Sequence, residues 1–219
     1  MESSSAKKYD YKIYVCGYFQ AGKTTLIHKL DPNAMSIEKP LRDLYRGEKS
    51  TTTLGFDLGH LVWTRPKENT DGVIMSLQQF KNEKKEYEGW IHKIIEIKGG
   101  PGQMHFKDMR NIVSKGSHGV LFLIDSADPG SIGKALTLIS ECQCFLGNNI
   151  PMVVIANKQD LDYAMSPEEI SELIGMKAYG GSAKNNFGIK EAVIKLLRII
   201  CGEIKQNNMG YNKIMQKVT

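Results

Sequence analysis

The residues best suited to chemistry form one run near the start of the chain. Residues 17–24 have the sequence G-Y-F-Q-A-G-K-T, with a glycine at the first and sixth positions and Lys23 and Thr24 at the end. This spacing is that of a phosphate-binding loop. Because Gly17 and Gly22 permit unusual dihedral angles and a close approach, the backbone N–H groups of residues 20–25 can surround a triphosphate. The predicted contacts are Gln20, Ala21, Gly22, Lys23, Thr24 and Thr25.

The side chains of this run suit a nucleotide with a metal ion. Lys23 can reach the β- and γ-phosphates as a point charge, and the Thr24 hydroxyl can bind Mg²⁺, a hard ion that prefers oxygen ligands. A helix that begins there adds the positive end of its dipole. The alternative is an ordinary glycine turn before a helix, but packing alone gives no reason for the Gly-Lys-Thr ending.

The surrounding elements predict a sheet that can present this loop. A strand over residues 11–16 precedes it and a helix over 25–30 follows it. Further strands are predicted at 58–63, 90–97, 119–125, 151–156 and 177–180, with helices at 106–114, 128–146, from 166 onward and at 188–201. Asp128 before Pro129 and Ser166 before Pro167 predict the N-terminal caps of two of these helices. Alternating strands and helices indicate an α/β fold of the P-loop NTPase type. We expect a mostly parallel six-stranded sheet with helices on both faces and one antiparallel hairpin strand carrying an insertion. Ligands bind at the carboxyl ends of such strands.

The domain boundaries follow from changes in composition. We expect a flexible segment over residues 1–10, a single domain over 11–203 and a polar tail over 204–219. The domain contains an insertion at about 64–88, which is either a solvated excursion or a surface for a partner. The polar stretch 31–50 has the character of a long functional loop.

Composition narrows the class of protein. The hydrophobic content of 41% and charged content of 24% are ordinary for a globular domain, and the net charge of +5 does not demand nucleic acid. The four cysteines lack the paired spacing of a zinc site, so we expect free thiols in a reducing compartment. No apolar run approaches the ~20 residues of a membrane span, and no signal-peptide core is present. We therefore expect a soluble cytoplasmic protein.

Five motifs in order resemble those of a Ras-superfamily small GTPase. They are the phosphate loop, Thr53 before Gly-Phe, Pro-Gly-Gln at 101–103, Asn-Lys-Gln-Asp at 157–160 and Ser-Ala-Lys at 182–184. The residues around 53–56, 125–126 and 157–160 are similar to those of the Arf-like branch. The Gly-Pro-Gly-Gln segment looks more like archaeal and bacterial members, including polarity-switch GTPases. The resemblance covers residues 11–201 without the insertion.

The resemblance implies GTP and GDP as ligands, and the later motifs have a chemical logic for guanine. Asp160 can accept hydrogen bonds from the N1–H and N2 amine of the base, which adenine lacks. Asn157 and the backbone N–H of Ala183 can hold the opposite edge, and the stem of Lys158 can cover one face. Ser182 and Lys184 would support the loop.

The resemblance also implies slow, Mg²⁺-dependent hydrolysis of GTP. Lys23 and Thr53 would act at the γ-phosphate, Thr24 and Thr53 would bind Mg²⁺, and Gln103 would orient the attacking water. Thr51 and Thr52 compete with Thr53 for its role. Gly102 would tie its loop to the γ-phosphate. Such a switch implies protein effectors, an exchange factor and an activating protein. We expect a monomer whose membrane association is at most peripheral or indirect.

The sequence departs from the family in three places. Gly99 stands where an aspartate normally contacts Mg²⁺ through water, and Glu96 three residues earlier is not expected to replace it. Phe19 occupies a loop position that is glycine in Ras and brings bulk near the γ-phosphate. Arg42 or Arg46 could supply an arginine finger within the chain, or both are ordinary loop residues.

These departures keep two further functions under consideration. A scaffold that holds GTP with negligible turnover is favoured by Gly99 and Phe19 and disfavoured by Gln103. A nucleotide kinase built on the same loop would need an arginine-rich lid and would leave residues 157–160 without a task.

Overall fold

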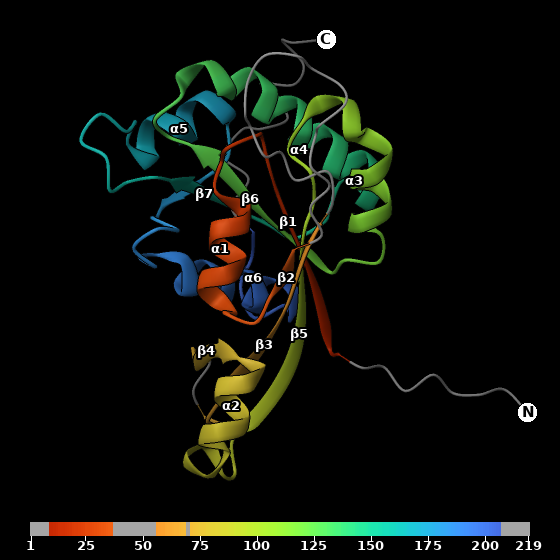
Figure 1. Ribbon diagram of the computed structural model, residues 1–219, viewed down its shortest axis with the longest axis vertical. Coiled ribbons are helices and arrows are strands. Elements are labelled where there is room, and N and C mark those ends of the chain that lie inside the picture. The colour runs from red at the N-terminus through yellow and green to blue at the C-terminus, as the bar shows by residue number, and fades with distance from the viewer. Residues whose placement is uncertain (1–8, 37–55, 69–70, 207–219) are drawn as a thin grey trace, which may run out of the picture.

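The computed structural model describes residues 9–36, 56–68 and 71–206. In this part of the chain an eight-stranded sheet lies between two layers of helices (Figure 1). The strand order is β2-β3-β5-β1-β6-β7-β8, and β4 also pairs with β3. The predicted α/β fold with a mostly parallel sheet is confirmed.

The parallel part of the sheet forms the centre of the molecule. It comprises β5 (Ile91–Gly99), β1 (Tyr11–Gly17), β6 (Gly119–Asp125), β7 (Met152–Asn157) and β8 (Ala178–Gly180). Every residue of β6 and β7 is buried. Both strands are nearly continuous apolar runs because helices cover both of their faces.

The antiparallel edge is longer than the sequence predicted. β3 (Asp57–Arg65) pairs with β5 from Asp57 opposite Gly99 to Arg65 opposite Ile91. Gly99 is therefore the last residue of a strand, whereas the sequence placed it in a loop, because the ladder with β3 continues to this point. Two short strands, β2 (Met35–Ser36) and β4 (Val73–Ser76), add to the six predicted ones along the outer edge of β3. They are too short to produce a recognisable alternation of residues.

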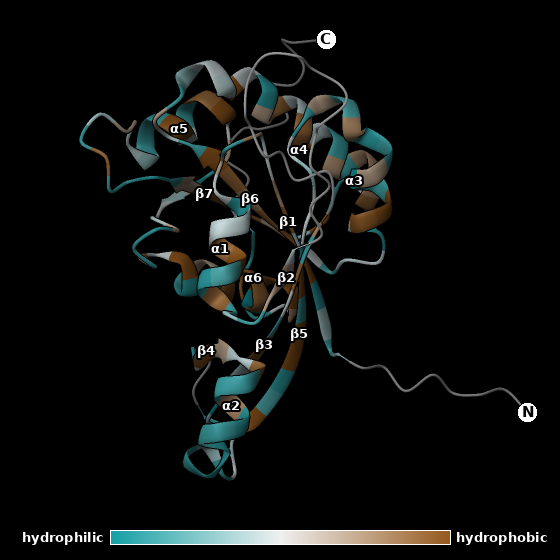
Figure 2. Ribbon diagram, viewed as in Figure 1, coloured by the Kyte–Doolittle hydropathy of each residue, from teal (hydrophilic) through white to brown (hydrophobic). Residues whose placement is uncertain are grey.

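Two helical layers bury the apolar faces of the sheet. α1 (Lys23–Leu30) and α6 (Ile189–Ile200) pack on one face. α3 (Lys107–Ser114), α4 (Ile132–Leu146) and α5 (Pro167–Ile174) pack on the other. Figure 2 shows the apolar strands between these layers and more hydrophilic residues on the outer surfaces of the helices. Among the described helices none is long and apolar enough to cross a membrane.

The ends of two helices test the sequence signals directly. Before α5, Ser166 accepts from the Glu169 N–H, and the Glu169 carboxylate accepts from the Ser166 N–H, which confirms the predicted cap. Before α4, a 3₁₀ turn (Pro129–Ser131) occupies the predicted first turn. The Asp128 side chain makes no capping hydrogen bond, contrary to expectation, since the tighter turn uses its backbone carbonyl instead.

The insertion folds at the far end of the β3–β5 hairpin, away from the loop end of α1 (Figure 1). After β4 come α2 (Leu77–Glu83) and a 3₁₀ turn (Lys84–Tyr87). The ring of Phe80 lies 4.7 Å from that of His92, and Tyr87 packs against Trp90. The insertion therefore contains a short helix of its own. An ion pair of 2.6 Å between Arg65 and Glu203 joins the hairpin to the segment after α6.

Candidate functional site

The phosphate-loop sequence forms the turn between β1 and α1, and its two glycines are required by contacts. Gly17 has φ +151°, and a Cβ there would lie 2.4 Å from the carbonyl oxygen of Leu123 in β6. Gly22 has φ +95°, and a Cβ there would lie 2.4 Å from the Asn157 amide nitrogen. α1 begins at Lys23, so its first N–H groups face the loop, two residues earlier than the helix start that the sequence predicted.

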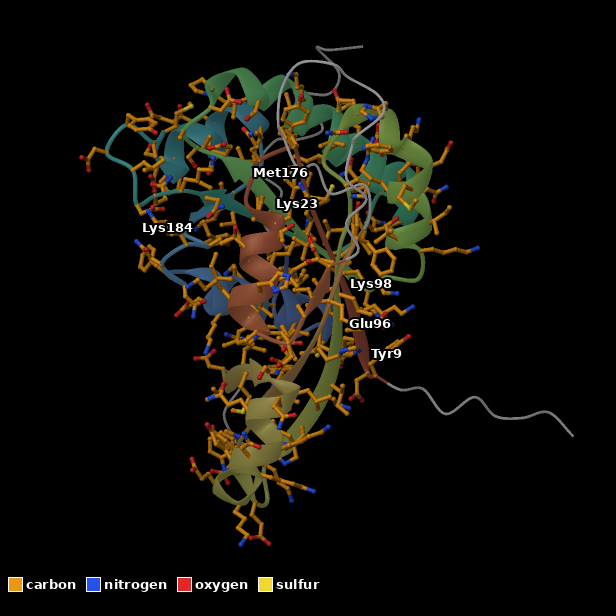
Figure 3. All side chains as sticks on the ribbon, viewed as in Figure 1. Tyr9, Lys23, Glu96, Lys98, Met176 and Lys184 are labelled. Atoms are coloured by element: carbon orange, nitrogen blue, oxygen red, sulfur yellow. The ribbon has the colours of Figure 1, made fainter. Side chains whose placement is uncertain are left out.

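Lys23 lies at the loop end of α1, as Figure 3 shows. Its Nζ donates to the carbonyls of Gly17 and Tyr18, at 2.9 and 3.0 Å. Burial lowers the pKa of the Lys23 ammonium to about 8. The group is therefore mostly charged at neutral pH, and a phosphate that approaches the loop meets a cation already fixed in direction.

Asn157 joins the phosphate loop to the loop after β8. Its side chain is buried, its Nδ2 donates to the Ala21 carbonyl at 2.7 Å, and its Oδ1 accepts from the Ala183 N–H at 2.8 Å. The predicted role of Asn157 and Ala183 at the edge of a base stays a prediction. In the structure these two groups bond to each other, so they set the spacing between the two loops.

Asp160 lies beside this junction. Ser182 Oγ donates to Asp160 Oδ1 at 2.6 Å, and Lys184 Nζ lies 3.9 Å from Oδ2. The Ser182 hydrogen bond is the main cause of a lowered pKa for the Asp160 carboxyl. Lys158 pairs with Asp125 at 2.5 Å. Asp160 is thus an ionised acceptor held in place by its neighbours, while the exposed Lys184 is loosely associated.

The segment after β5 approaches the phosphate loop closely. A Cβ at Gly102 would lie 2.5 Å from Lys23 Nζ and 2.7 Å from the Phe19 nitrogen. Gln103 follows directly, and its buried Oε1 accepts no hydrogen bond from the described residues. The arrangement brings Gly102 against the loop and places Gln103 at its margin. The predicted roles of both residues at the γ-phosphate stay predictions.

Arg110 of α3 holds this segment and was not predicted as a site residue. It is 2% exposed, and its Nη atoms donate to the backbone carbonyls of Gln103 and Met104. It also pairs with Glu141 of α4 at 2.7 Å. The sequence carried no signal for these bonds, because they join a side chain to backbone atoms outside its own helix.

Asp57 is a second residue that the motifs did not identify. It is 3% exposed at the start of β3, and it accepts from Thr24 Oγ1 at 2.7 Å and from Ser36 Oγ at 2.5 Å. No cluster of three or more His, Cys, Asp or Glu side chains suited to a metal occurs among the described residues. Mg²⁺ needs only one or two protein oxygens beside phosphate oxygens and water, so Thr24 with Asp57 fits this ion.

Several predicted residues lie at the edge of the site or outside the described residues. Gln20 and Thr25 are exposed on the loop and the first turn of α1. Thr53, Arg42 and Arg46 lie outside the described residues, as do the competing positions 51 and 52. Their predicted roles stay predictions.

Comparison with known proteins agrees with this geometry. The Ras family model matches residues 66–202. The chain is 32% identical over 127 residues to Ras-related protein Rab-21 of Dictyostelium discoideum, covering 52% of this chain and 60% of that protein. It is 31% identical over 102 residues to human Rab-21, covering 44% and 45%. Ras-related protein RabC of Dictyostelium discoideum is 22% identical over 209 residues, covering 93% of this chain and 90% of that protein.

The matches to the Rab-21 proteins span about half of their length. The family match covers more than half of this chain, from the residue after β3 through α6. It includes Gln103, Asn157, Asp160 and the loop after β8. The chain therefore belongs to the Ras family of small GTPases.

Proposed function

We propose that the chain binds GTP and GDP together with Mg²⁺, hydrolyses GTP slowly and acts as a molecular switch. The observation that carries this proposal is the pair of hydrogen bonds made by Asn157. They fix the phosphate-binding loop and the loop after β8 at one spacing, and Ser182 of the second loop holds the ionised Asp160 beside this junction. A ligand that spans the two loops needs a triphosphate at one end and adjacent N–H donors at the other, which describes a guanine nucleotide.

Recognition of the base rests on Asp160. Its carboxylate is ionised, because the Ser182 hydroxyl holds its pKa low, and it retains free lone pairs toward solvent. Such a group pairs with the N1–H and N2 amine of guanine. In adenine the carboxylate would face a hydrogen-bond acceptor and stay unpaired, so the site rejects that base. The stem of Lys158 is available beside it as one wall.

Binding of the phosphates rests on Lys23, the N–H groups of the loop and the start of α1. Mg²⁺, when bound, neutralises charge that develops on the phosphate oxygens. The residues of this chain hold the triphosphate, exclude water from its flanks and orient the nucleophile. We assign the last task to Gln103. Two observations support this assignment: Gly102 lies against Lys23, and Arg110 donates to the backbone carbonyls of Gln103 and Met104.

Hydrolysis by positioning alone is slow, on the order of 10⁻⁴ s⁻¹. We expect partners to read the nucleotide state through residues 99–106 and the segment that contains Thr53, and to include effectors, an exchange factor and an activating protein. Arg42 or Arg46 remains a candidate arginine finger. A monomeric, cytoplasmic protein with peripheral or indirect membrane association, similar to the Arf-like or archaeal and bacterial branches, completes the proposal.

A GTP-holding scaffold with negligible turnover is the second candidate. It is favoured by one observation, the glycine at position 99, where the family normally carries a carboxylate. Phe19, whose backbone nitrogen lies 2.7 Å from a Cβ built on Gly102, points the same way.

Two measurements on the purified protein test these functions. Competition of GTP, GDP and ATP against a fluorescent GDP analogue tests recognition, and the Asp160→Ala variant should lose the preference for guanine. Single-turnover hydrolysis of GTP, with Gln103→Leu beside the wild type, tests turnover. Failure to bind any guanine nucleotide contradicts the whole proposal. Tight binding with intact GTP in both proteins supports the scaffold.

A further inference from the structure

The glycine at position 99 faces an acidic residue on the neighbouring strand. Asp57 and Gly99 are register partners at the end of the β3–β5 ladder, so their side-chain positions lie on the same face of the sheet. A Cβ built on Gly99 would lie 3.1 Å from Asp57 Oδ2 and 3.4 Å from Asp57 Cβ. The Asp57 side chain therefore occupies the space that a side chain at position 99 would enter.

The Asp57 carboxylate is oriented toward the start of α1. Its Oδ2 accepts from Thr24 Oγ1 at 2.7 Å, and its Oδ1 accepts from Ser36 Oγ, which also contacts His28 Nε2 at 2.8 Å. Asp57 forms no ion pair with a Lys, Arg or His of the described residues. Lys23 interacts with its charge only at longer range, since the Lys23 Nζ donates to the loop carbonyls. A buried carboxylate held by hydroxyl groups alone is costly to desolvate and is a suitable partner for a cation.

We propose that Asp57 supplies the acidic group of the Mg²⁺ site that Gly99 lacks. The carboxylate then comes from β3, directly opposite its usual position on β5. This inference rests on the proposed function. Asp57 would act on the ion together with Thr24, directly or through water. The glycine is then a requirement rather than a loss, because an aspartate at both positions would place two carboxylates in one volume.

The other acidic residue nearby does not fit this role. Glu96 lies three residues before Gly99 on β5, and successive side chains on a strand alternate between faces. It therefore points away from Thr24, and its carboxylate lies 3.0 Å from Lys98 Nζ and 3.7 Å from Lys12 Nζ. Figure 3 shows Glu96 and Lys98 together on β5, well below Lys23. Glu96 is a matched control, since it is a buried carboxylate on the adjacent strand.

The test measures the dissociation rate of a fluorescent GDP analogue from the full chain over a range of free Mg²⁺. We expect Mg²⁺ to slow dissociation from the wild type. Asp57→Asn should raise the Mg²⁺ concentration for half of this effect by about 10- to 100-fold, the usual cost of losing a residue that supports a metal site. Glu96→Gln should leave this midpoint unchanged. Dissociation at zero Mg²⁺ reports nucleotide binding without the ion.

A double variant moves the carboxylate back across the ladder. In Asp57→Ser with Gly99→Asp, the new side chain enters the space that Asp57 vacates. It displaces only Ile27 Cδ1, the flexible end of a side chain, which lies 2.7 Å from the Cβ position. The Mg²⁺ midpoint should return to within about threefold of wild type, a difference of about 0.65 kcal/mol. Asp57→Ser alone should behave like Asp57→Asn.

The outcomes separate this inference from the proposed function. If wild type binds no guanine nucleotide, both fail. If the wild type binds the nucleotide but Mg²⁺ does not change its dissociation rate, the inference fails and the nucleotide site stands. No variant is needed for this conclusion. If Asp57→Asn keeps the wild-type midpoint, or if the double variant does not restore it, Asp57 is only a structural support for the hydroxyls of Thr24 and Ser36.

Discussion

Replacing Arg110 with methionine should destabilise the protein by about 3 kcal/mol. The side chain is 2% exposed, so the change leaves the Glu141 carboxylate and two backbone carbonyls without their donor. Breaking a buried ion pair by removing one partner costs about 3–5 kcal/mol. The Glu141 side chain is 13% exposed, so solvent contact reduces the cost to the lower end of that range. At about 2–4 °C per kcal/mol for a chain of this size, the melting temperature should fall by about 6–12 °C.

Urea unfolding followed by circular dichroism measures this loss, at a fixed nucleotide concentration because ligands add their own stabilisation. Lys93→Met provides the matched control, since Lys93 pairs with Asp10 at the surface with 39% and 37% exposure. Its loss should cost less than about 1 kcal/mol. A cycle with Glu141→Leu should give a coupling of at least about 1 kcal/mol between Arg110 and Glu141.

Arg110 also positions Gln103, so a second measurement separates its roles. Single-turnover hydrolysis should slow in Arg110→Met while affinity for GDP stays near wild type, because the hydrogen bonds of Arg110 reach the Gln103 segment and not the phosphate loop. An Arg110→Met protein that unfolds like the Lys93→Met control would refute the assignment of this ion pair as an anchor.

Three further changes test the loop, its lysine and a helix cap. Gly17→Ala should lower the free energy of unfolding in urea by about 1–3 kcal/mol, because its Cβ meets a carbonyl of β6. Gly147→Ala, also at positive φ but with no atom within 4 Å of the Cβ, should cost less. Equal losses would show that the contact with β6 is not the cause. Nucleotide affinity should fall as the pH rises through about 8, where Lys23 loses its proton. Titrations of Lys23→Arg should lack this fall, since arginine stays charged. A fall of the same size in both proteins would mean that another group causes it. Ser166→Ala should lower the unfolding free energy by about 1 kcal/mol, and Ser166→Asp, which can still cap α5, should not; equal effects would exclude the cap.

The parts of this protein that local sequence could predict are those fixed by neighbouring residues. The phosphate loop needs Gly17, Gly22 and Lys23 at set spacings within one turn, and the buried strands β6 and β7 need only continuous apolar runs. The cap of α5 is likewise contained in four residues, from Ser166 to Glu169. The two strands, the cap and the turn between β1 and α1 were confirmed, while the contacts of that loop with phosphate stay predictions.

The parts that could not be predicted depend on contacts across the chain. Asp57 lies opposite Gly99 because β3 and β5 pair across an insertion. The length of that insertion conceals where the hairpin turns, so the sequence does not indicate which residues of the two strands face each other. For the same reason the sequence showed Gly99 only as a missing carboxylate. The role of Arg110 rests on backbone carbonyls of another segment, which no pattern of residue types records.

The two hydrogen bonds of Asn157 make one amide proton a probe of the whole site. The Ala183 N–H exchanges with solvent deuterium only when its bond to Asn157 opens, so its protection factor measures the free energy needed to separate the two loops. A ligand that holds both loops at 100 times its dissociation constant should add about 2.7 kcal/mol to that free energy. A ligand that holds only the phosphate loop should add less, and the difference between the two is the energetic coupling that Asn157 transmits.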